Sequence, residues 1–464
     1  KLDCRSSGAR AAEHRRVRAR GDDERELPAG VALGAQTAPG DAVGFIEIPL
    51  PNGKMVRAAL ERSWVIAVTD THSTVVVGFI FCYGAEANSD DLQQLLHLCL
   101  RKWNRIPIPE ELIHLRYGCL ICMPGEDPRL EGLCPAELLV DNALINYSIA
   151  VHRFQTRTGC ALNWGPPGQW FRRDVVERLF GVMETFGVRR TPSSTGSHPK
   201  DPLKGNPPKD AITKGVRAEH LEAVAAVLIG NRNGGTNEAA SHTAPLLQLE
   251  NLVEGRHGIP RRLPPLLPGQ PDIGEIVVRC TVRARADKGR RPYVHCHGDY
   301  TGRRLLSNSS GVVGKSVILH INAENGAKAT MFLEDGTEYE ELELLGPWKD
   351  FPHTLRLRRQ VEGLIKAGKI KVLAGEDAPT AYNRSLAEAA LSQVKDKQGR
   401  HRSSRAASDL KTMSRQTGMP IAEASAARAA RRNSGISPIS PQEDEEMPSY
   451  LEKNRRPHGE RDHE

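Results

Sequence analysis

The sequence predicts an α/β protein with a mixed sheet flanked by helices, followed by a small all-β barrel and a disordered charged tail. Three observations carry this prediction. Short β-rich runs near the start give way to alternating strand and helix patterns, which is typical of layered α/β domains. Further on, residues 276–345 hold five or six short strands separated by turns, a spacing that suits a small barrel. Polar residues dominate from residue 374 onward, so that part buries too little apolar surface to fold alone.

The bulk composition limits the classes of protein that fit. With 464 residues, the chain is long enough for two or three domains. The sequence contains neither a continuous apolar stretch of membrane-spanning length nor a signal peptide, so we expect no membrane partner. Its nine cysteines are scattered, which fits a reducing cytoplasm better than a disulfide framework. A net charge of +7 permits a nucleic-acid partner without requiring one, because Lys and Arg also cluster locally. Since the chain starts at Lys1, we expect it to be a fragment that lacks its natural N-terminus.

The N-terminal part is expected to contain an insertion and then an antiparallel meander. Residues 5–41 are rich in Arg, Ala and Gly without a steady period, so we expect a disordered basic insertion. Tight turns such as Asn52-Gly53 then join several β-rich runs. These runs are residues 43–49, 55–60, 64–70 and 75–81.

Strands and helices alternate in the next part of the chain. A helical period covers residues 90–103, with Ser89 or Asp90 as the expected N-cap. A short apolar strand at 136–140 ends on Asp141, and an amphipathic helix at 169–186 carries Glu177. The remaining expected elements are helices at 142–154, 217–231, 243–253 and 355–367, and a short strand at 159–163.

Asp141 and Glu177 are the candidate chemistry-bearing acids. Two-metal phosphoryl transfer needs carboxylates from separate elements, because they must converge on a pair of divalent ions. Thirty-five residues lie between the strand-end aspartate and the helical glutamate. The third acid is open between Asp3 and Asp70, and Asp70 follows the more convincing strand. The plain alternative for Asp141 and Glu177 is a turn residue and a solvated helix acid.

Several segments resemble the catalytic half of DDE-type bacterial transposases of the retroviral integrase superfamily, similar to the Mu transposase. Lys1-Leu2-Asp3 resembles the opening strand with its first catalytic aspartate, and residues 60–78 resemble the strands that follow. Residues 138–142 resemble the second catalytic motif, and residues 174–180 resemble the glutamate helix. The likeness extends through residues 195–201, 259–266 and 293–345, and so covers most of the chain up to Gly346.

The resemblance implies a ribonuclease H-like core and a defined chemistry. Asp3, Asp141 and Glu177 would be the catalytic residues and the ligands of two Mg²⁺ or Mn²⁺ ions. Asp70 and Asp174 would be neighbouring acids that do not touch the metals. The enzyme would nick the 3′ ends of a transposon with water and then join them to target DNA. Implied partners are double-stranded DNA of the ends and target, an AAA+ ATPase and further copies of the chain, in a bacterial cytoplasm at the nucleoid.

The expected domain boundaries follow from these segments. They are a catalytic core at 1–209, a helical linker region at 210–270, a small β-barrel at 271–346, a helical extension at 347–373 and a disordered charged tail at 374–464. Within that tail, the resemblance suggests that the apolar residues 447–451 dock on the ATPase.

Basic residues around the glutamate helix are expected to contact DNA phosphates, although an ordinary charged helix face is the alternative. They are Arg172, Arg173, Arg178, Arg189 and Arg190. The basic residues of the barrel could serve DNA or protein contacts equally well. Cys119 and Cys122 have the spacing of half a zinc site, but a structural site needs four ligands, so buried free thiols are favoured.

Departures from the family pattern keep a second function open. The insertion at 5–41 separates Asp3 from the next strand, and Thr74 stands where the family usually has an arginine. The modules that recognise transposon ends are absent from this sequence. The alternative function is therefore a catalytically inactive transposase remnant that binds DNA or protein, and a host nuclease of the ribonuclease H type is a weaker third.

Overall fold

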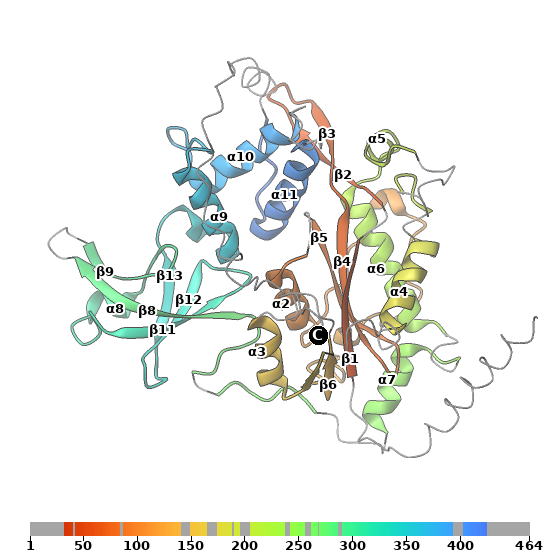
Figure 1. The fold of residues 1–464 in the computed structure, drawn as a ribbon, viewed down its shortest axis with the longest axis horizontal. Coiled ribbons are helices and arrows are strands. Elements are labelled where there is room, and N and C mark those ends of the chain that lie inside the picture. Colours follow the sequence, from red (N-terminus) through yellow and green to blue (C-terminus); the bar gives the residue numbers. More distant parts are fainter. Residues whose placement is uncertain are drawn as a thin grey trace, which may run out of the picture.

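The protein is described from a computed structural model, in which a mixed sheet, a closed barrel and a group of C-terminal helices can be distinguished (Figure 1). The residues described are 32–39, 42–83, 87–140, 149–164, 174–187, 190–194, 205–236, 242–255, 261–267, 269–285, 290–392 and 402–424. Asp3, Asp141, Arg172, Arg173 and Arg189 lie outside them.

The central sheet has five strands in the order β5-β4-β1-β6-β7. The strand β4 runs antiparallel to both of its neighbours, β1 and β5, whereas β6 and β7 run parallel to β1. The core elements, in chain order, are β1 (Ala32–Pro39), β2 (Phe45–Pro49), β3 (Met55–Ala59), β4 (Ser63–Asp70), β5 (Val76–Tyr83), α2 (Ser89–Leu98), β6 (Glu137–Leu139), α3 (Ile149–Thr158), β7 (Ala161–Asn163), α4 (Asp174–Phe186), α5 (Pro207–Thr213), α6 (Ala218–Gly234) and α7 (Pro245–Glu254). Two 3-10 turns, η1 (Glu110–Leu112) and η2 (Pro124–Glu126), lie between α2 and β6.

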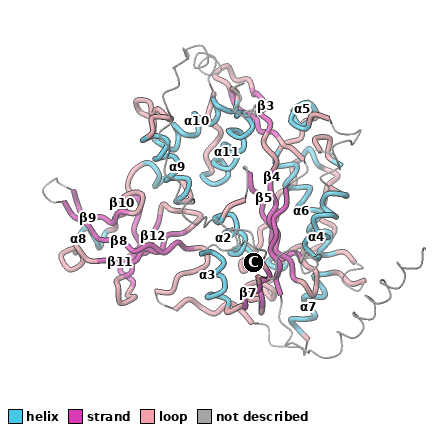
Figure 2. The backbone as a smooth tube through the Cα atoms, viewed as in Figure 1, coloured by secondary structure: helices cyan, strands magenta, loops and turns pink. Residues whose placement is uncertain are grey.

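The sheet is buried on both faces because successive strand residues point to opposite sides. In β4, Ile66 and Val68 pack in one cluster with Leu95 of α2 and Phe154 of α3. Their neighbours Val65 and Ala67 belong to a second cluster with Val176 and Leu179 of α4. Helices α2 and α3 therefore cover one face, and α4 and α6 cover the other, as Figure 1 shows. Figure 2 shows how the connecting loops join these layers at the ends of the strands.

Two expectations for the N-terminal part were wrong. The strand between β4 and β6 is β1, which lies inside the range 5–41 that we expected to be a disordered insertion. Its composition of Ala, Gly, Gln and Thr gave no strand signal, and its pairing on both sides compensates for that weak propensity. The meander is also split, because β2 and β3 form a separate two-stranded sheet while β4 and β5 join the central one. Helix α2 begins one residue away from the expected caps, since Asn88 accepts the hydrogen bond of Asp90 N at 3.0 Å.

The predicted barrel is confirmed as a closed barrel with the strand order β10-β13-β12-β11-β8-β9. Alternate residues of β11, including Val317, Leu319 and Ile321, are fully buried inside it. The strand β10 and the short helix α8 had no sequence signal that we recognised. The barrel elements are β8 (Glu275–Arg285), β9 (Arg290–His295), β10 (Asp299–Thr301), α8 (Arg303–Ser307), β11 (Ser316–Asn322), β12 (Lys328–Phe332) and β13 (Glu338–Leu344).

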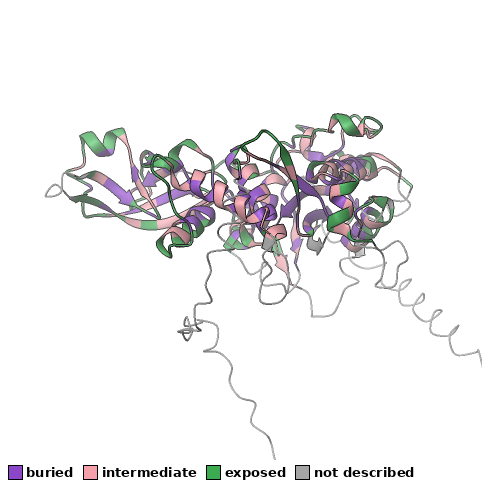
Figure 3. Ribbon diagram, turned by 90° about the horizontal axis from the view of Figure 1, so that it is seen from above, coloured by how far each residue is buried: buried purple, intermediate pink, exposed green. Residues whose placement is uncertain are grey.

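The polar C-terminal part is folded where the structure describes it, which corrects the expectation of a disordered tail from residue 374. After η8 (Pro347–Asp350), three helices follow: α9 (Leu355–Lys366), α10 (Ala378–Ala390) and α11 (Arg402–Thr417). In α11, the residues Ala407, Leu410 and Met413 are almost completely buried, and they recur at helical spacing. Figure 3 shows buried residues between the sheet and its helices, inside the barrel and among these last helices. Residues 425–464, which include the expected docking segment 447–451, lie outside the described part.

Among the described residues, none of the helices combines the length and apolar character needed to cross a bilayer.

Candidate functional site

The end of β6 is where the sequence placed one of the candidate acids. This strand pairs in parallel with β1, so that Gly34 lies opposite Leu139. Beyond it, Val140 is buried and donates a backbone hydrogen bond to Asn163 O of β7 at 3.1 Å. Continued by one residue, the parallel register places Val140 level with residue 35, near the middle of β1. Asp141 itself is outside the described residues.

Glu177 lies in the first turn of α4 as the structure describes that helix. The helix packs against β1 and β4, and Val176 and Leu179 are buried on its sheet-facing side. Glu177 is partly buried between these two positions and the exposed Arg178. A carboxylate at the border of a packed helix can face an ion or a substrate without losing all its hydration. The side chain of Asp174, at the start of the helix, is not among those described.

The central strand bears on the expected role of Asp3. We expected residues 1–3 to form the opening strand beside β4, but that place in the sheet is held by β1. The sequence of β1 contains no Asp or Glu. No carboxylate of β1 therefore lies level with the end of β6, and the assignment of Asp3 stays a prediction outside the described residues.

Asp70, the alternative first acid, closes the turn between β4 and β5. It is fully buried, and its Oδ2 accepts hydrogen bonds from Ser73 N at 2.7 Å and Ser73 Oγ at 2.6 Å. Burial raises the pKa of Asp70, although the hydrogen bonds from Ser73 act in the opposite direction. Thr74 follows with a positive φ of 62°, a strained conformation that a well-bonded turn can hold. The observed contacts of Asp70 are those of a structural acid.

Two residues of α6 that the sequence did not single out fix the same turn. The side chain of Asn233 is fully buried and bonds to the backbone of Val76. Its Oδ1 accepts from Val76 N at 2.9 Å, and its Nδ2 donates to Val76 O at 2.9 Å. Arg232 donates from Nη1 to Thr74 O at 2.7 Å. Both lie in an ordinary helical run, so no spacing or composition signal distinguishes them; only the fold brings α6 to the end of β5.

The described arginines of the expected DNA-contacting set are Arg178 and Arg190, and both are exposed. Burial lowers the pKa of Arg232, and the positive charge of Arg178 nearby lowers it further. Two cations of α4 and α6 therefore lie close together near the β4–β5 turn. Arg190 donates from Nε to Thr185 O at 3.2 Å, which holds its side chain against the end of α4.

A metal site in the described residues would need several His, Cys, Asp or Glu side chains close together. In that part of the chain, no group of three or more His, Cys, Asp or Glu side chains could hold a metal ion. Of the three expected ligands, only Glu177 belongs to the described residues. Cys119 and Cys122 are free thiols whose sulfur atoms lie 2.9 Å apart, and no further ligand joins them.

Comparisons with known proteins add little to this description. No protein-family model matches the chain, and no protein with a curated description matches it. Among solved structures, the chain is similar to the catalytic core domain of BIV integrase, with 13% sequence identity and a TM-score of 0.21, over 46% of this chain and 95% of that one. It is also similar to the simian T-cell lymphotropic virus intasome in complex with PP2A regulatory subunit B56 gamma, with 12% identity and a TM-score of 0.25, over 70% of this chain and 81% of that one. Similarity this weak supports no conclusion about fold or function. The description of the architecture therefore depends on the strand order and register alone.

Proposed function

We propose that this chain is a DDE-type DNA transposition protein of the retroviral integrase superfamily, with a ribonuclease H-like sheet. The observation that supports the proposal best is the strand order β5-β4-β1-β6-β7 with three antiparallel strands followed by two parallel ones. In the transposase family that the sequence resembles, the second catalytic acid would follow the fourth strand of such a sheet. The third catalytic acid would lie on the helix after the fifth strand. Asp141 follows β6 by two residues, and Glu177 lies on α4, the helix after β7.

The proposed ligands of two Mg²⁺ or Mn²⁺ ions are Asp3, Asp141 and Glu177. When bound, such ions activate the attacking oxygen and stabilise the leaving oxygen of a phosphodiester. The carboxylate of Glu177 is an oxygen donor of the kind that these hard cations prefer. Because Glu177 is held on a helix packed against the sheet, its backbone position is fixed before substrate arrives.

Positive charge beside α4 would hold the DNA backbone. Arg178 and Arg190 are exposed there, and Arg232 adds a partly buried cation. Contacts of this kind give affinity that falls with salt and is independent of sequence. The proposed substrates are double-stranded transposon ends and target DNA, and the proposed partners are an AAA+ ATPase and further copies of the chain. The proposed setting is the bacterial nucleoid.

Strand transfer with pre-nicked transposon-end DNA tests the proposal, using the full-length protein. We expect Asp141→Asn and Glu177→Gln to reduce product to background while leaving DNA binding intact. Glu184→Gln, two turns further along α4, is the matched control and should keep activity. Normal strand transfer by Asp141→Asn would rule the proposal out.

A catalytically inactive DNA- or protein-binding remnant is the second candidate, and one observation favours it. The strand β1, which lies between β4 and β6, has no acidic residue, so this strand supplies no first ligand. Titration of the folded protein with Mn²⁺ separates the two candidates. An active core should show a site that Asp141→Asn abolishes, whereas a remnant should show none and yet retain salt-dependent DNA binding.

A further inference from the structure

Two cysteines of the barrel lie opposite each other on neighbouring strands. Cys280 of β8 pairs with Val317 of β11, whose side chain is fully buried in the barrel. Because directly opposite residues share a face of the sheet, Cys280 also points inward. The β8–β9 ladder pairs Val282 with Val294. The same antiparallel register, continued two residues back from Val282 and two residues on from Val294, places Cys280 opposite Cys296. Cys296 is 5% exposed and belongs to the same core cluster against which Cys280 packs.

This arrangement suits a disulfide. Opposite Cα atoms in an antiparallel pair are about 4.5–5.5 Å apart. Disulfides bridge Cα atoms about 4.4–6.8 Å apart, so no backbone rearrangement is needed. Both thiols are free in the structure, and Cys280 is only partly buried.

A buried cation accompanies the pair. Arg358 of α9 is fully buried, and its guanidinium donates to Tyr300 Oη at 2.7 Å, to Gly326 O at 3.4 Å and to Cys296 O at 3.4 Å. All three acceptors are neutral oxygens. Within the described residues, no carboxylate forms an ion pair with Arg358, and its Nε has no hydrogen-bond partner. A guanidinium buried without an anion is costly, so the site favours a negative charge nearby.

The anion that this site favours is the thiolate of Cys296. The hydrogen bond from Cys280 and the charges of Arg358 and His295 lower the pKa of Cys296 to about 7, against the effect of burial. The pKa of Cys280 is raised instead, chiefly through the same hydrogen bond. The pair thus loses its first proton easily and its second with difficulty, as expected for a dithiol that shares one proton.

We propose that Cys280 and Cys296 form an oxidisable dithiol that is specific for small two-electron oxidants of the hydroperoxide class. In the first step, the Cys296 thiolate attacks a peroxide oxygen, the O–O bond breaks, and the products are a Cys296 sulfenic acid and hydroxide. In the second step, the Cys280 sulfur attacks the Cys296 sulfur, the S–O bond breaks, and water leaves with the Cys280 proton. The two sulfurs together lose two electrons and form one disulfide between β8 and β9.

The chain carries its own comparison pair. Cys119 and Cys122 are also close, with their sulfur atoms 2.9 Å apart. The nearby Arg105 is exposed and is bound to the carboxylate of Glu126. Burial raises the pKa of Cys122 to about 12, so its thiolate is scarce at neutral pH. Both cysteine pairs are therefore close together, and they differ in how readily Cys296 and Cys122 form a thiolate.

Mass spectrometry after a brief hydrogen peroxide pulse tests the proposal on the full chain, with remaining thiols then blocked. Trypsin should release residues 280–283 joined to residues 291–303. We expect this linkage to form at least about tenfold faster than one between Cys119 and Cys122, because thiolate fraction sets the rate. Its rate should rise with pH and level off above about pH 7–8.

Two variants separate the steps. Cys280→Ser should abolish the linkage and leave a Cys296 sulfenic acid that dimedone traps, whereas Cys296→Ser should give neither product. Arg358→Met should slow Cys296 oxidation, and circular dichroism of the variant would show whether the barrel has kept its fold. Oxidation of Cys119 and Cys122 ahead of the barrel pair, or dimedone labelling of Cys280 in place of Cys296, would overturn the proposal.

Discussion

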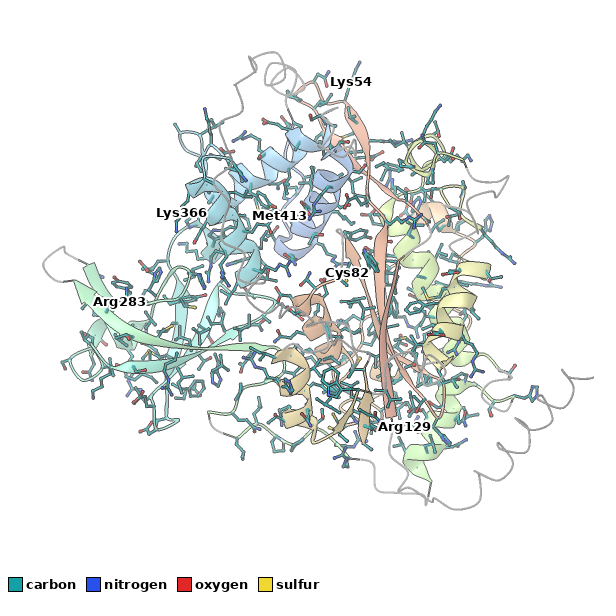
Figure 4. All side chains as sticks on the ribbon, in the orientation of Figure 1. Lys54, Cys82, Arg129, Arg283, Lys366 and Met413 are labelled. Atoms are coloured by element: carbon teal, nitrogen blue, oxygen red, sulfur yellow. The ribbon has the colours of Figure 1, made fainter. Side chains whose placement is uncertain are left out.

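Within the described residues, two of the contacts between the C-terminal half of the molecule and the core differ in their chemistry. One is a charged junction, in which the strap 272–275 that leads into the barrel lies against α2 and α3. The other is an apolar and hydrogen-bonded cover, in which α11 lies along β5. Figure 4 labels Met413 on α11 and Cys82 on β5, the two elements that meet there. We therefore expect the first contact to depend mainly on charge and the second mainly on packing.

The charged junction centres on His97 of α2. This side chain is almost fully buried, with Nε2 3.6 Å from Asp272 Oδ2 and Nδ1 3.9 Å from Glu324 Oε1 of the β11–β12 turn. Arg157 of α3 lies 3.6 Å from Asp272 on its other side. A Cβ on Gly274 would come within 2.3 Å of the His97 ring, so the strap passes this close only because residue 274 is glycine.

The cover over β5 is built from hydrogen bonds to backbone carbonyls and from the apolar packing of helix α11. Because β5 ends the strand order, one of its edges has no strand partner in the sheet. Arg415 Nη1 donates to Phe81 O at 2.7 Å, and Thr412 Oγ1 donates to Tyr83 O at 2.9 Å. Leu410 is fully buried and belongs to the same core cluster as Phe81 and Tyr83. Covering a free edge in this way prevents pairing with other strands.

The largest expected effect comes from the packed cover. Replacing Leu410 by Ala removes a fully buried side chain and should lower the free energy of unfolding by about 2–5 kcal/mol. Chemical denaturation measures this, and hydrogen exchange should show faster exchange along β5. Leu373→Ala, at a position 41% exposed, is the control and should change stability by less than about 0.5 kcal/mol. Equal effects of the two substitutions would mean that α11 is not part of the fold.

A smaller effect is expected at the charged junction. Asp272→Asn removes the carboxylate that faces His97 and Arg157, and should cost about 1–3 kcal/mol because buried partners are left unpaired. Denaturation monitored with a probe in the barrel would measure the loss. The control is Lys328→Gln, which breaks an exposed ion pair with Glu341 and should leave stability unchanged within error. If both variants were equally stable, the junction would have no energetic role.

The smallest effect is the pH dependence of the junction. Burial lowers the pKa of His97, but the carboxylates of Asp272 and Glu324 outweigh it and the net pKa is raised, with Arg101 opposing. The histidine therefore contributes stability that is complete below its unfolded pKa, about 6.5, and is lost as pH rises through its higher folded pKa. The pKa of Asp272 is lowered to about 2, chiefly by His97, so its contribution is complete above about pH 4 and is lost as pH falls toward 2.

We therefore expect the junction to be most stable between about pH 4 and 6.5 and to weaken above that window. Stability curves of the parent and of His97→Gln should converge as pH rises past the folded pKa of His97. A pH-independent difference between the parent and His97→Gln would show that His97 acts by packing alone.

The sequence by itself determined the elements with strong periodicity. The β4 and β5 runs, the α4 and α6 helices and the closed barrel follow from apolar spacing and turn residues, which are local properties. Local pattern also selected Glu177 and the strand that ends before Asp141. It misjudged α11 because the buried stripe Ala407, Leu410 and Met413 is narrow and surrounded by polar residues.

Only the tertiary structure decided what depends on partners far apart in the chain. The weakly apolar β1 becomes the central strand because it pairs with β4 on one side and β6 on the other, and each backbone hydrogen bond made there is non-local. The role of Asp70 as a turn cap, the closeness of His97 to Asp272, and the pairing of Cys280 with Cys296 are set in the same way. Burial and electrostatic contact depend on neighbours in space, and a sequence read in order lists only neighbours along the chain.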